Sequence, residues 1–224
     1  MTTRPWLAAA TLLSALLAIA SAPWALDLAT LNYVFKPLTT VLVICHAWPR
    51  GQETPLLRRW VLVGLFFSLA GDVFLMWPKE GFLPGLVSFL LAHLAYLAAF
   101  TRTVRFAARP LVFAAYGAVA VVILSILWPG VPGALRVPVV AYVVCLACMA
   151  AQAAVVWRSG PASDAVLALG GALFMTSDAL LATNKFAAAL PMASLWILAS
   201  YWAAQWCIAS WLAPATTAGS PPAR

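Results

Sequence analysis

The chain has 224 residues, of which 65% are apolar and 8% are charged, and its mean hydropathy is +0.97. A water-soluble domain must cover its surface with polar groups, so this composition excludes one and indicates a protein whose solvent is lipid. The net charge of +7 comes from Lys and Arg residues that are scattered singly between apolar runs, which argues against a nucleic-acid partner.

Eight apolar segments follow one another along the chain, each close to the ~20 residues that a helix needs to span a bilayer. Tryptophan lies at or next to many of their ends, where its amphipathic ring prefers the headgroup level. We therefore predict an all-α polytopic membrane protein, with a single transmembrane domain over residues 1–213 and a disordered Pro/Thr/Ser-rich tail at 214–224. The predicted spans are residues 6–24, 28–48, 60–77, 82–100, 110–128, 134–157, 164–183 and 190–212.

Lys and Arg residues are distributed unequally between the two sides of this arrangement. By the positive-inside rule both termini are cytoplasmic, in a multi-pass protein of the inner cell membrane. The first segment could instead be a cleaved signal peptide, because Arg4 precedes an apolar run that ends in small residues. The side of the termini holds Arg4, Arg50, Arg58, Arg59, Arg102, Arg105, Arg109, Arg158 and Arg224, whereas the other side holds Lys79, Arg136 and Lys185.

Two stretches that lie 106 residues apart resemble each other. Asp72 follows Gly71 and precedes Lys79 by seven residues, and Asp178 precedes Lys185 by the same distance. Four predicted spans separate the two copies, so both halves would have the same topology. The sequence therefore predicts two parallel four-helix repeats.

Two aspartates, Asp72 and Asp178, fall inside predicted spans, at about the same depth in the non-cytoplasmic third of the membrane. A charged side chain at mid-bilayer costs at least ~2.5–3.5 kcal/mol, so each one calls for a reason. A polar pocket that opens toward the non-cytoplasmic side would house both aspartates together with the other polar residues of the spans. These residues are Lys36, His93, Tyr96, Tyr142, Tyr201 and Gln205.

Two carboxyl groups in one buried pocket favour a state in which one is protonated and the other is ionised. Such a pair supplies the acid and the base of general acid–base catalysis, and Lys36 or His93 is available to stabilise the anion. We therefore predict that Asp72 and Asp178 are catalytic, without assigning acid and base. Lys36 could instead extend to the membrane interface, and His93 could serve helix packing.

Two other functions fit parts of this pattern. A proton-coupled transporter of a small or lipid-like substrate would also use membrane carboxylates and repeated halves, although broken helices are not evident and Pro37 and Pro138 are the interruptions that the spans offer. An intramembrane aspartyl protease would also use two aspartates on different spans. However, residues 69–72 read Leu-Ala-Gly-Asp and lack the first glycine of the G-x-G-D signature.

Several short pieces of the sequence, in this order and spacing, resemble the YhhN-like lysoplasmalogenase family of membrane proteins over about residues 30–210. Trp202 departs from the family pattern, which has a Tyr at this place. The matching pieces are Lys36-Pro37-Leu38, Gly71-Asp72, Gly85 with Ala92-His93-x-x-Tyr96, Gly171-Ala172-Leu173-Phe174-x-x-Ser177-Asp178 with Asn184-Lys185-Phe186, and Tyr201-x-Ala203-Ala204-Gln205.

The resemblance implies hydrolysis of the vinyl ether bond of lysoplasmalogens to a fatty aldehyde and a glycerophospho-head group, without a metal or another cofactor. It also implies that the partner is a lysophospholipid in the bilayer; a homodimer is compatible with the sequence. Substrate binding or tuning of Asp72 and Asp178 would then fall to Lys36, His93, Tyr96, Tyr142, Asn184, Lys185, Tyr201 and Gln205.

Overall fold

A computed structural model describes residues 5–77 and 79–214 of the chain. These residues form eight long α-helices and contain no β-strand, which confirms the all-helical prediction for this part of the chain. The predicted disordered tail lies outside the described residues, apart from Pro214. The helices are α1 (Pro5–Ala20), α2 (Ala29–Ala47), α3 (Pro55–Phe74), α4 (Phe82–Phe100), α5 (Pro110–Leu127), α6 (Arg136–Ser159), α7 (Ala165–Phe186) and α8 (Ala193–Trp211).

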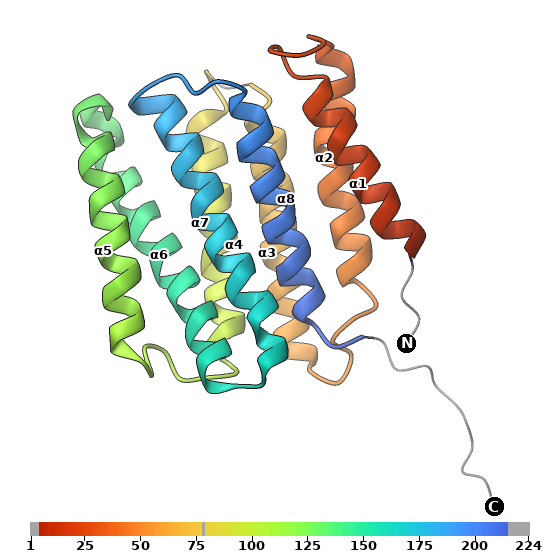
Figure 1. The fold of residues 1–224 in the computed structure, drawn as a ribbon, viewed down its shortest axis with the longest axis vertical. Coiled ribbons are helices and arrows are strands. Elements are labelled where there is room, and N and C mark those ends of the chain that lie inside the picture. The colour runs from red at the N-terminus through yellow and green to blue at the C-terminus, as the bar shows by residue number, and fades with distance from the viewer. Residues whose placement is uncertain (1–4, 78, 215–224) are drawn as a thin grey trace, which may run out of the picture.

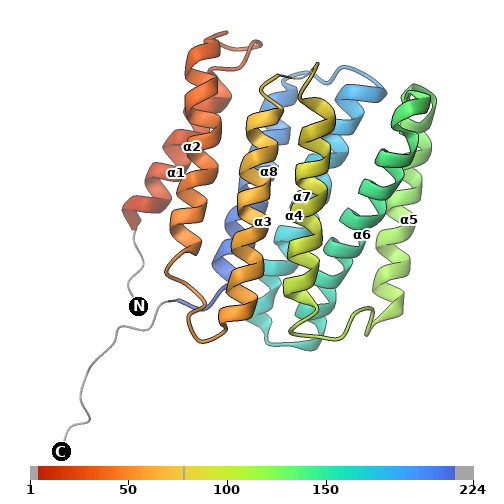
Figure 2. The ribbon, with the colours of Figure 1, turned by 180° about the vertical axis from the view of Figure 1, so that it is seen from behind.

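The helices stand side by side in two layers of four (Figure 1 and Figure 2). Helices α1, α8, α7 and α5 form one layer, and α2, α3, α4 and α6 form the other. The most extensive contacts join α3 to α4 and α7 to α8. Helix α2 packs on α3 and α8, and α6 packs on α7 and α4. The four central helices α3, α4, α7 and α8 are therefore flanked by α2 on one side and by α6 on the other.

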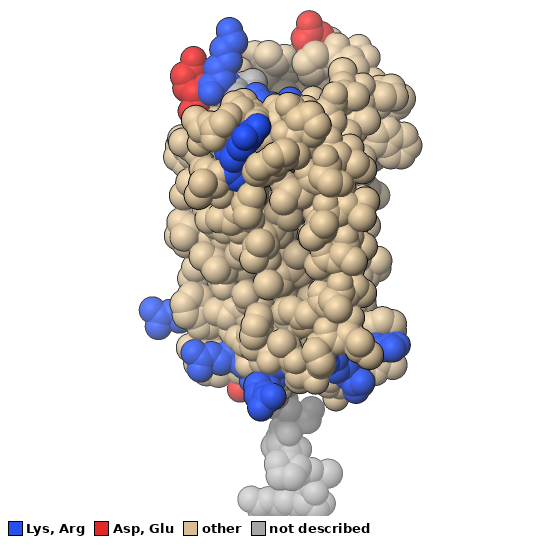
Figure 3. Space-filling view, turned by 90° about the vertical axis from the view of Figure 1, so that its left-hand side faces the viewer, with Lys and Arg blue, Asp and Glu red and all other residues tan. Residues whose placement is uncertain are grey.

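Four helical stretches are long and apolar enough to cross a membrane, namely Phe82–Phe100, Pro110–Gly130, Gly133–Ser159 and Ala162–Phe186. Helix α1 is apolar but shorter, with 16 residues. Figure 3 shows one side of the molecule, on which charged side chains gather toward the two ends and leave a broad band without them. A charge-free band suits contact with lipid tails. The chain is therefore a multi-pass membrane protein.

Each predicted apolar segment overlaps one helix, and the observed bounds differ most from the predicted ones at α3. This helix runs from Pro55 to Phe74, whereas the apolar pattern predicted residues 60–77. Proline is favoured in the first turn of a helix because its missing N–H has no partner there in any case. The first turn also includes Arg58, whose Nε and Nη2 donate to the Trp48 carbonyl oxygen at 3.0 and 2.6 Å and tie α3 to the end of α2.

Helices α3 and α4 approach closely because glycines of α3 face α4. A Cβ atom on Gly64 would overlap the Tyr96 ring, and one on Gly71 would overlap the Phe89 ring. Small residues permit such close helix contacts in membrane proteins, where van der Waals packing rather than the hydrophobic effect holds helices together.

The variant Gly64→Ala should therefore unfold at a lower temperature than the parent protein. The added methyl group would displace the buried Tyr96 ring, and overpacking of this kind typically costs about 1–3 kcal/mol. The matched control is Gly117→Ala in α5, where the new Cβ would have no described neighbour within 4 Å beyond the adjacent backbone of its own helix. Thermal unfolding in detergent measures both variants, and equal melting temperatures for the two would contradict the prediction.

Candidate active site

A polar cavity of about 470 Å³ lies at the end of the bundle that carries the α1–α2, α3–α4 and α7–α8 connections. This end is opposite the one at which α8 finishes (Figure 1). Helices α2, α3, α4, α7 and α8 all contribute to its walls. The residues predicted from the sequence that line it are Lys36, Asp72, Asp178, Asn184, Lys185 and Tyr201.

Asp72, on α3, is 2% exposed and is held from two other helices. Its Oδ2 atom accepts hydrogen bonds from Thr40 Oγ1 on α2 at 2.6 Å and from the Tyr201 hydroxyl on α8 at 2.9 Å. The Thr40 hydroxyl in turn accepts a hydrogen bond from Trp202 Nε1 at 3.2 Å. The Trp at which the chain departs from the family pattern therefore orients the threonine that binds Asp72.

Two lysines bring positive charge to the cavity. Lys36 lies one helical turn before Thr40 on α2 and lines the cavity together with Asp72. Lys185 stands near the end of α7, with Nζ 4.8 Å from the centre of the Phe82 ring. The adjacent Asn184 accepts a hydrogen bond from the Leu190 amide at 2.9 Å, so it also shapes the connection between α7 and α8.

Asp178, on α7, has a different set of neighbours. Its Oδ2 atom accepts a hydrogen bond from the Tyr142 hydroxyl on α6 at 2.5 Å, and His93 Nε2 on α4 lies 3.7 Å from the same oxygen. The His93 side chain is fully buried, and among the described residues neither of its ring nitrogens has a hydrogen-bond partner. The edge-to-face packing of His93 on Phe174, with ring centroids 4.7 Å apart, fixes the imidazole beside the carboxyl group.

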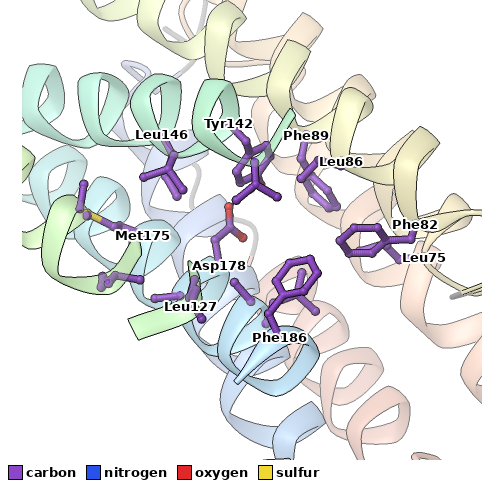
Figure 4. Close-up of a pocket in the computed structure, with 17 residues that line it drawn as sticks. Leu75, Phe82, Leu86, Phe89, Leu127, Tyr142, Leu146, Met175, Asp178 and Phe186 are labelled. Carbon is purple, nitrogen blue, oxygen red and sulfur yellow. The ribbon is translucent and has the colours of Figure 1, made fainter. Parts of the chain in front are cut away.

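Asp178 also belongs to a second, apolar cavity of about 60 Å³. Figure 4 shows its carboxyl group directed toward Tyr142, with Leu, Phe and Met side chains around it. Asp178 and Tyr142 bring the polar atoms of this lining, which is otherwise hydrocarbon. The polar and apolar cavities share Leu75, Phe82, Phe89, Asp178 and Leu181. The Asp178 side chain therefore stands where a polar space meets an apolar one.

The two aspartates face one polar cavity but are not bonded to each other. Within residues 5–77 and 79–214, no hydrogen bond joins their carboxyl groups, and each carboxyl has its own donors. The rings of Phe89 and Tyr201, which also line the cavity, pack edge to face with centroids 5.7 Å apart. Two separately held carboxyl groups can act on a substrate from two positions, one as acid and one as base.

Tyr96 and Gln205, which the sequence grouped with the site, do not line the cavity. The Tyr96 hydroxyl donates to Gln205 Oε1 at 2.6 Å and links α4 to α8 deeper in the bundle. Sequence reasoning also overlooked Thr40, which the structure places on Asp72. Its position one turn after Lys36, on the same helix face, was the available signal.

Comparison with known proteins matches the chain to one family of membrane proteins. The model of the YhhN family matches residues 31–212, which include every predicted site residue. The chain is 31% identical to human lysoplasmalogenase TMEM86A over 66% of its own length and 35% identical to human lysoplasmalogenase TMEM86B over 70%. In each case the match spans 63% of the human protein.

The chain is also 30% identical to the uncharacterized membrane protein YhhN of Escherichia coli O6:H1, over 63% of this chain and 67% of that protein. No solved structure matches the chain significantly. The family match extends from α2 to α8 and includes all lining residues of the two cavities except Ala22 and Pro23. The chain therefore belongs to the YhhN family.

Proposed function

We propose that the chain is a membrane-embedded lysoplasmalogenase, which cleaves the vinyl ether bond of a lysoplasmalogen to a fatty aldehyde and a glycerophospho-head group. The observation that carries this proposal is the position of Asp178 between a polar cavity with two lysines and an apolar cavity. The substrate has the same division, because its vinyl ether joins a charged head to a hydrocarbon chain. The names of the human relatives support this substrate class.

In this proposal Asp178 is the acid and Asp72 is the base. Asp178 donates a proton to the vinyl carbon beta to the ether oxygen, which leaves an oxocarbenium-like cation at the carbon attached to that oxygen. Asp72 takes a proton from a water molecule while the water oxygen attacks the cation, and a hemiacetal forms. The hemiacetal then breaks its bond to the glycerol oxygen: the protonated Asp72 gives its proton to that oxygen, which leaves as an alcohol, and the ionised Asp178 takes the proton of the hemiacetal hydroxyl as the aldehyde forms. Both carboxyl groups thereby return to their starting states.

The head group is bound in the polar cavity by Lys36 and Lys185. Lysine is a common ligand of phosphate, which it binds as a point charge. With the phosphate near these residues, the glycerol lies toward Asp72 and Tyr201, and the vinyl ether lies at the boundary where Asp178 stands. The two lysines thereby balance the negative charge of the Asp72 carboxylate and of the phosphate.

The proposed arrangement in the membrane has all eight helices crossing the bilayer as two parallel repeats, with both termini on the cytoplasmic side of the inner membrane. The bonding pattern supports the repeat, because Asp72 on α3 is contacted from α2 and α8, and Asp178 on α7 is contacted from α6 and α4. These are equivalent helices of the two halves. The excess of Arg at the end with the α2–α3, α4–α5 and α6–α7 connections supports the orientation.

The test is an assay of the purified protein with a panel of lysophospholipids that carry the same head group and a 1-alkenyl, 1-alkyl or 1-acyl chain. We expect fatty aldehyde from the alkenyl lipid and no cleavage of the alkyl lipid, because only the vinyl ether can be protonated on carbon. Mass spectrometry identifies the products. Failure to release aldehyde from any alkenyl lipid would refute the proposal, and substrate-dependent proton flux without a product would favour a transporter.

A further inference from the structure

We propose that the hydrocarbon chain of the substrate occupies the apolar cavity at Asp178 and continues sideways into the bilayer through a groove between α5 and α7. This inference rests on the proposed function, because it assigns a path to the chain of the same lipid. The groove is then a hydrocarbon-binding site on a surface away from the polar cavity, and the residues between cavity and groove set the chain-length preference.

The groove has a volume of about 450 Å³ and lies against the apolar cavity. Ile123 on α5 and Met175 and Ala179 on α7 line both spaces, so these three side chains form the boundary between them. The apolar cavity itself is small, with about 60 Å³, and has room for only the first methylene groups beyond the vinyl ether. A longer chain must therefore continue elsewhere, and the groove is the adjoining apolar space.

The chemistry of the groove suits a hydrocarbon occupant. Two of its lining residues are threonines, but both donate their hydroxyl hydrogens to carbonyl oxygens of their own helix. Thr176 Oγ1 donates to Ala172 at 2.9 Å, and Thr183 Oγ1 donates to Ala179 at 2.7 Å. With these hydroxyls satisfied, Tyr116 brings the one further side-chain hydroxyl among the lining residues, and the other side chains are Ala, Val, Leu, Ile and Met, to which a lipid tail makes favourable contacts.

Helix α5 has few contacts with α7, which leaves room for such an opening. Of its 18 residues, Ala120 and Leu127 are buried, and the helix packs mainly on α6, with a short contact to α7. The outward face of α5 carries exposed apolar residues such as Val121 and Val122, at 67% and 58% exposure, so this side of the bundle borders the lipid tails. A chain leaving through the groove therefore enters hydrocarbon and not water.

The variant Ile123→Trp tests the path, because the larger side chain would fill the boundary between cavity and groove. We expect kcat/KM for a long-chain hexadecenyl lysolipid to fall about tenfold or more, and that for a short-chain butenyl lysolipid to fall clearly less, because only the long chain has to pass the boundary. The matched control is Ile126→Trp on the same helix, since Ile126 is 61% exposed and lines neither space. Ile126→Trp should leave the ratio of long-chain to short-chain activity unchanged. An unchanged ratio in Ile123→Trp, or an equal change in the control, would overturn the proposal.

A second measurement does not depend on catalysis. A 1-alkyl lysophosphatidylcholine with a diazirine in the middle of its chain is bound to the parent protein and photolysed, and labelled peptides are identified by mass spectrometry. We expect labels on α5 and α7, in the segments around Ile123 and Met175. Labels confined to α1, α2 or α3 would overturn the path. If the parent protein releases no aldehyde, the proposed function fails, but the labelling still decides where the chain lies.

Discussion

Asp72→Asn and Asp178→Asn should each lower aldehyde release by about 10²-fold or more, since general acid or base catalysis contributes roughly 10²–10⁴-fold to a rate. An amide has nearly the same shape as the carboxyl group, but it can neither donate the proton to the vinyl carbon nor accept one from water. The measurement is the initial rate of aldehyde formation from an alkenyl lysolipid by the purified variants.

These two variants should remain folded. The amide oxygen introduced by Asp72→Asn can still accept hydrogen bonds from Thr40 and Tyr201, and removal of a buried charge does not by itself weaken the packing. The matched control is Asp164→Asn at the opposite end of the bundle, where the carboxyl group accepts a hydrogen bond from Trp211. Parent-like rates in both cavity variants, with Asp164→Asn also active, would show that the aspartates have no part in the chemistry.

Tyr142→Phe should lower the rate by about 10- to 100-fold, because a hydrogen bond to a charged group is worth about 1.5–3 kcal/mol. The Tyr142 hydroxyl donates to Asp178 at 2.5 Å, so it would stabilise the carboxylate that remains after proton transfer. The loss should appear in kcat more than in KM, since the bond strengthens as Asp178 becomes charged.

The control for Tyr142→Phe is Tyr33→Phe, which removes a hydroxyl from a tyrosine that is 45% exposed and stacks on Trp77. This change should leave kcat and KM close to those of the parent protein. A Tyr142→Phe variant with parent-like kcat would exclude a role of the hydroxyl in proton transfer and leave it a role in packing alone.

The sequence predicted the residues that are costly in lipid better than it predicted their partners. Asp72 and Asp178 stand out because a carboxyl group inside an apolar run needs a compensating environment, and the structure places both at one cavity. The same logic selected Tyr96 and Gln205, which form a hydrogen bond with each other deeper in the bundle. A polar residue in a span needs hydrogen-bond partners, but the sequence does not tell whether a neighbouring residue or a substrate provides them.

Contacts between distant helices were beyond prediction for a related reason. Thr40 and Trp202 are 162 residues apart, and their hydrogen bond depends on the packing of α2 against α8. Hydropathy gives the position of each helix along the chain but says little about which helices become neighbours. The apolar cavity escaped prediction as well, because its lining residues look like ordinary lipid-facing side chains in the sequence.

The hydrogen bonds around Asp72 have a consequence for the synthesis of the protein. Asp72 and Thr40 are on α3 and α2, but Tyr201 and Trp202, which complete their bonding, are on α8, which is synthesised later. During synthesis, Asp72 therefore lacks the hydrogen bond from Tyr201, and Thr40 lacks the hydrogen bond from Trp202, until α8 has been made and packed against α2. The environment of Asp72 is therefore set by tertiary packing after translation of α8, and not by the earlier helices alone.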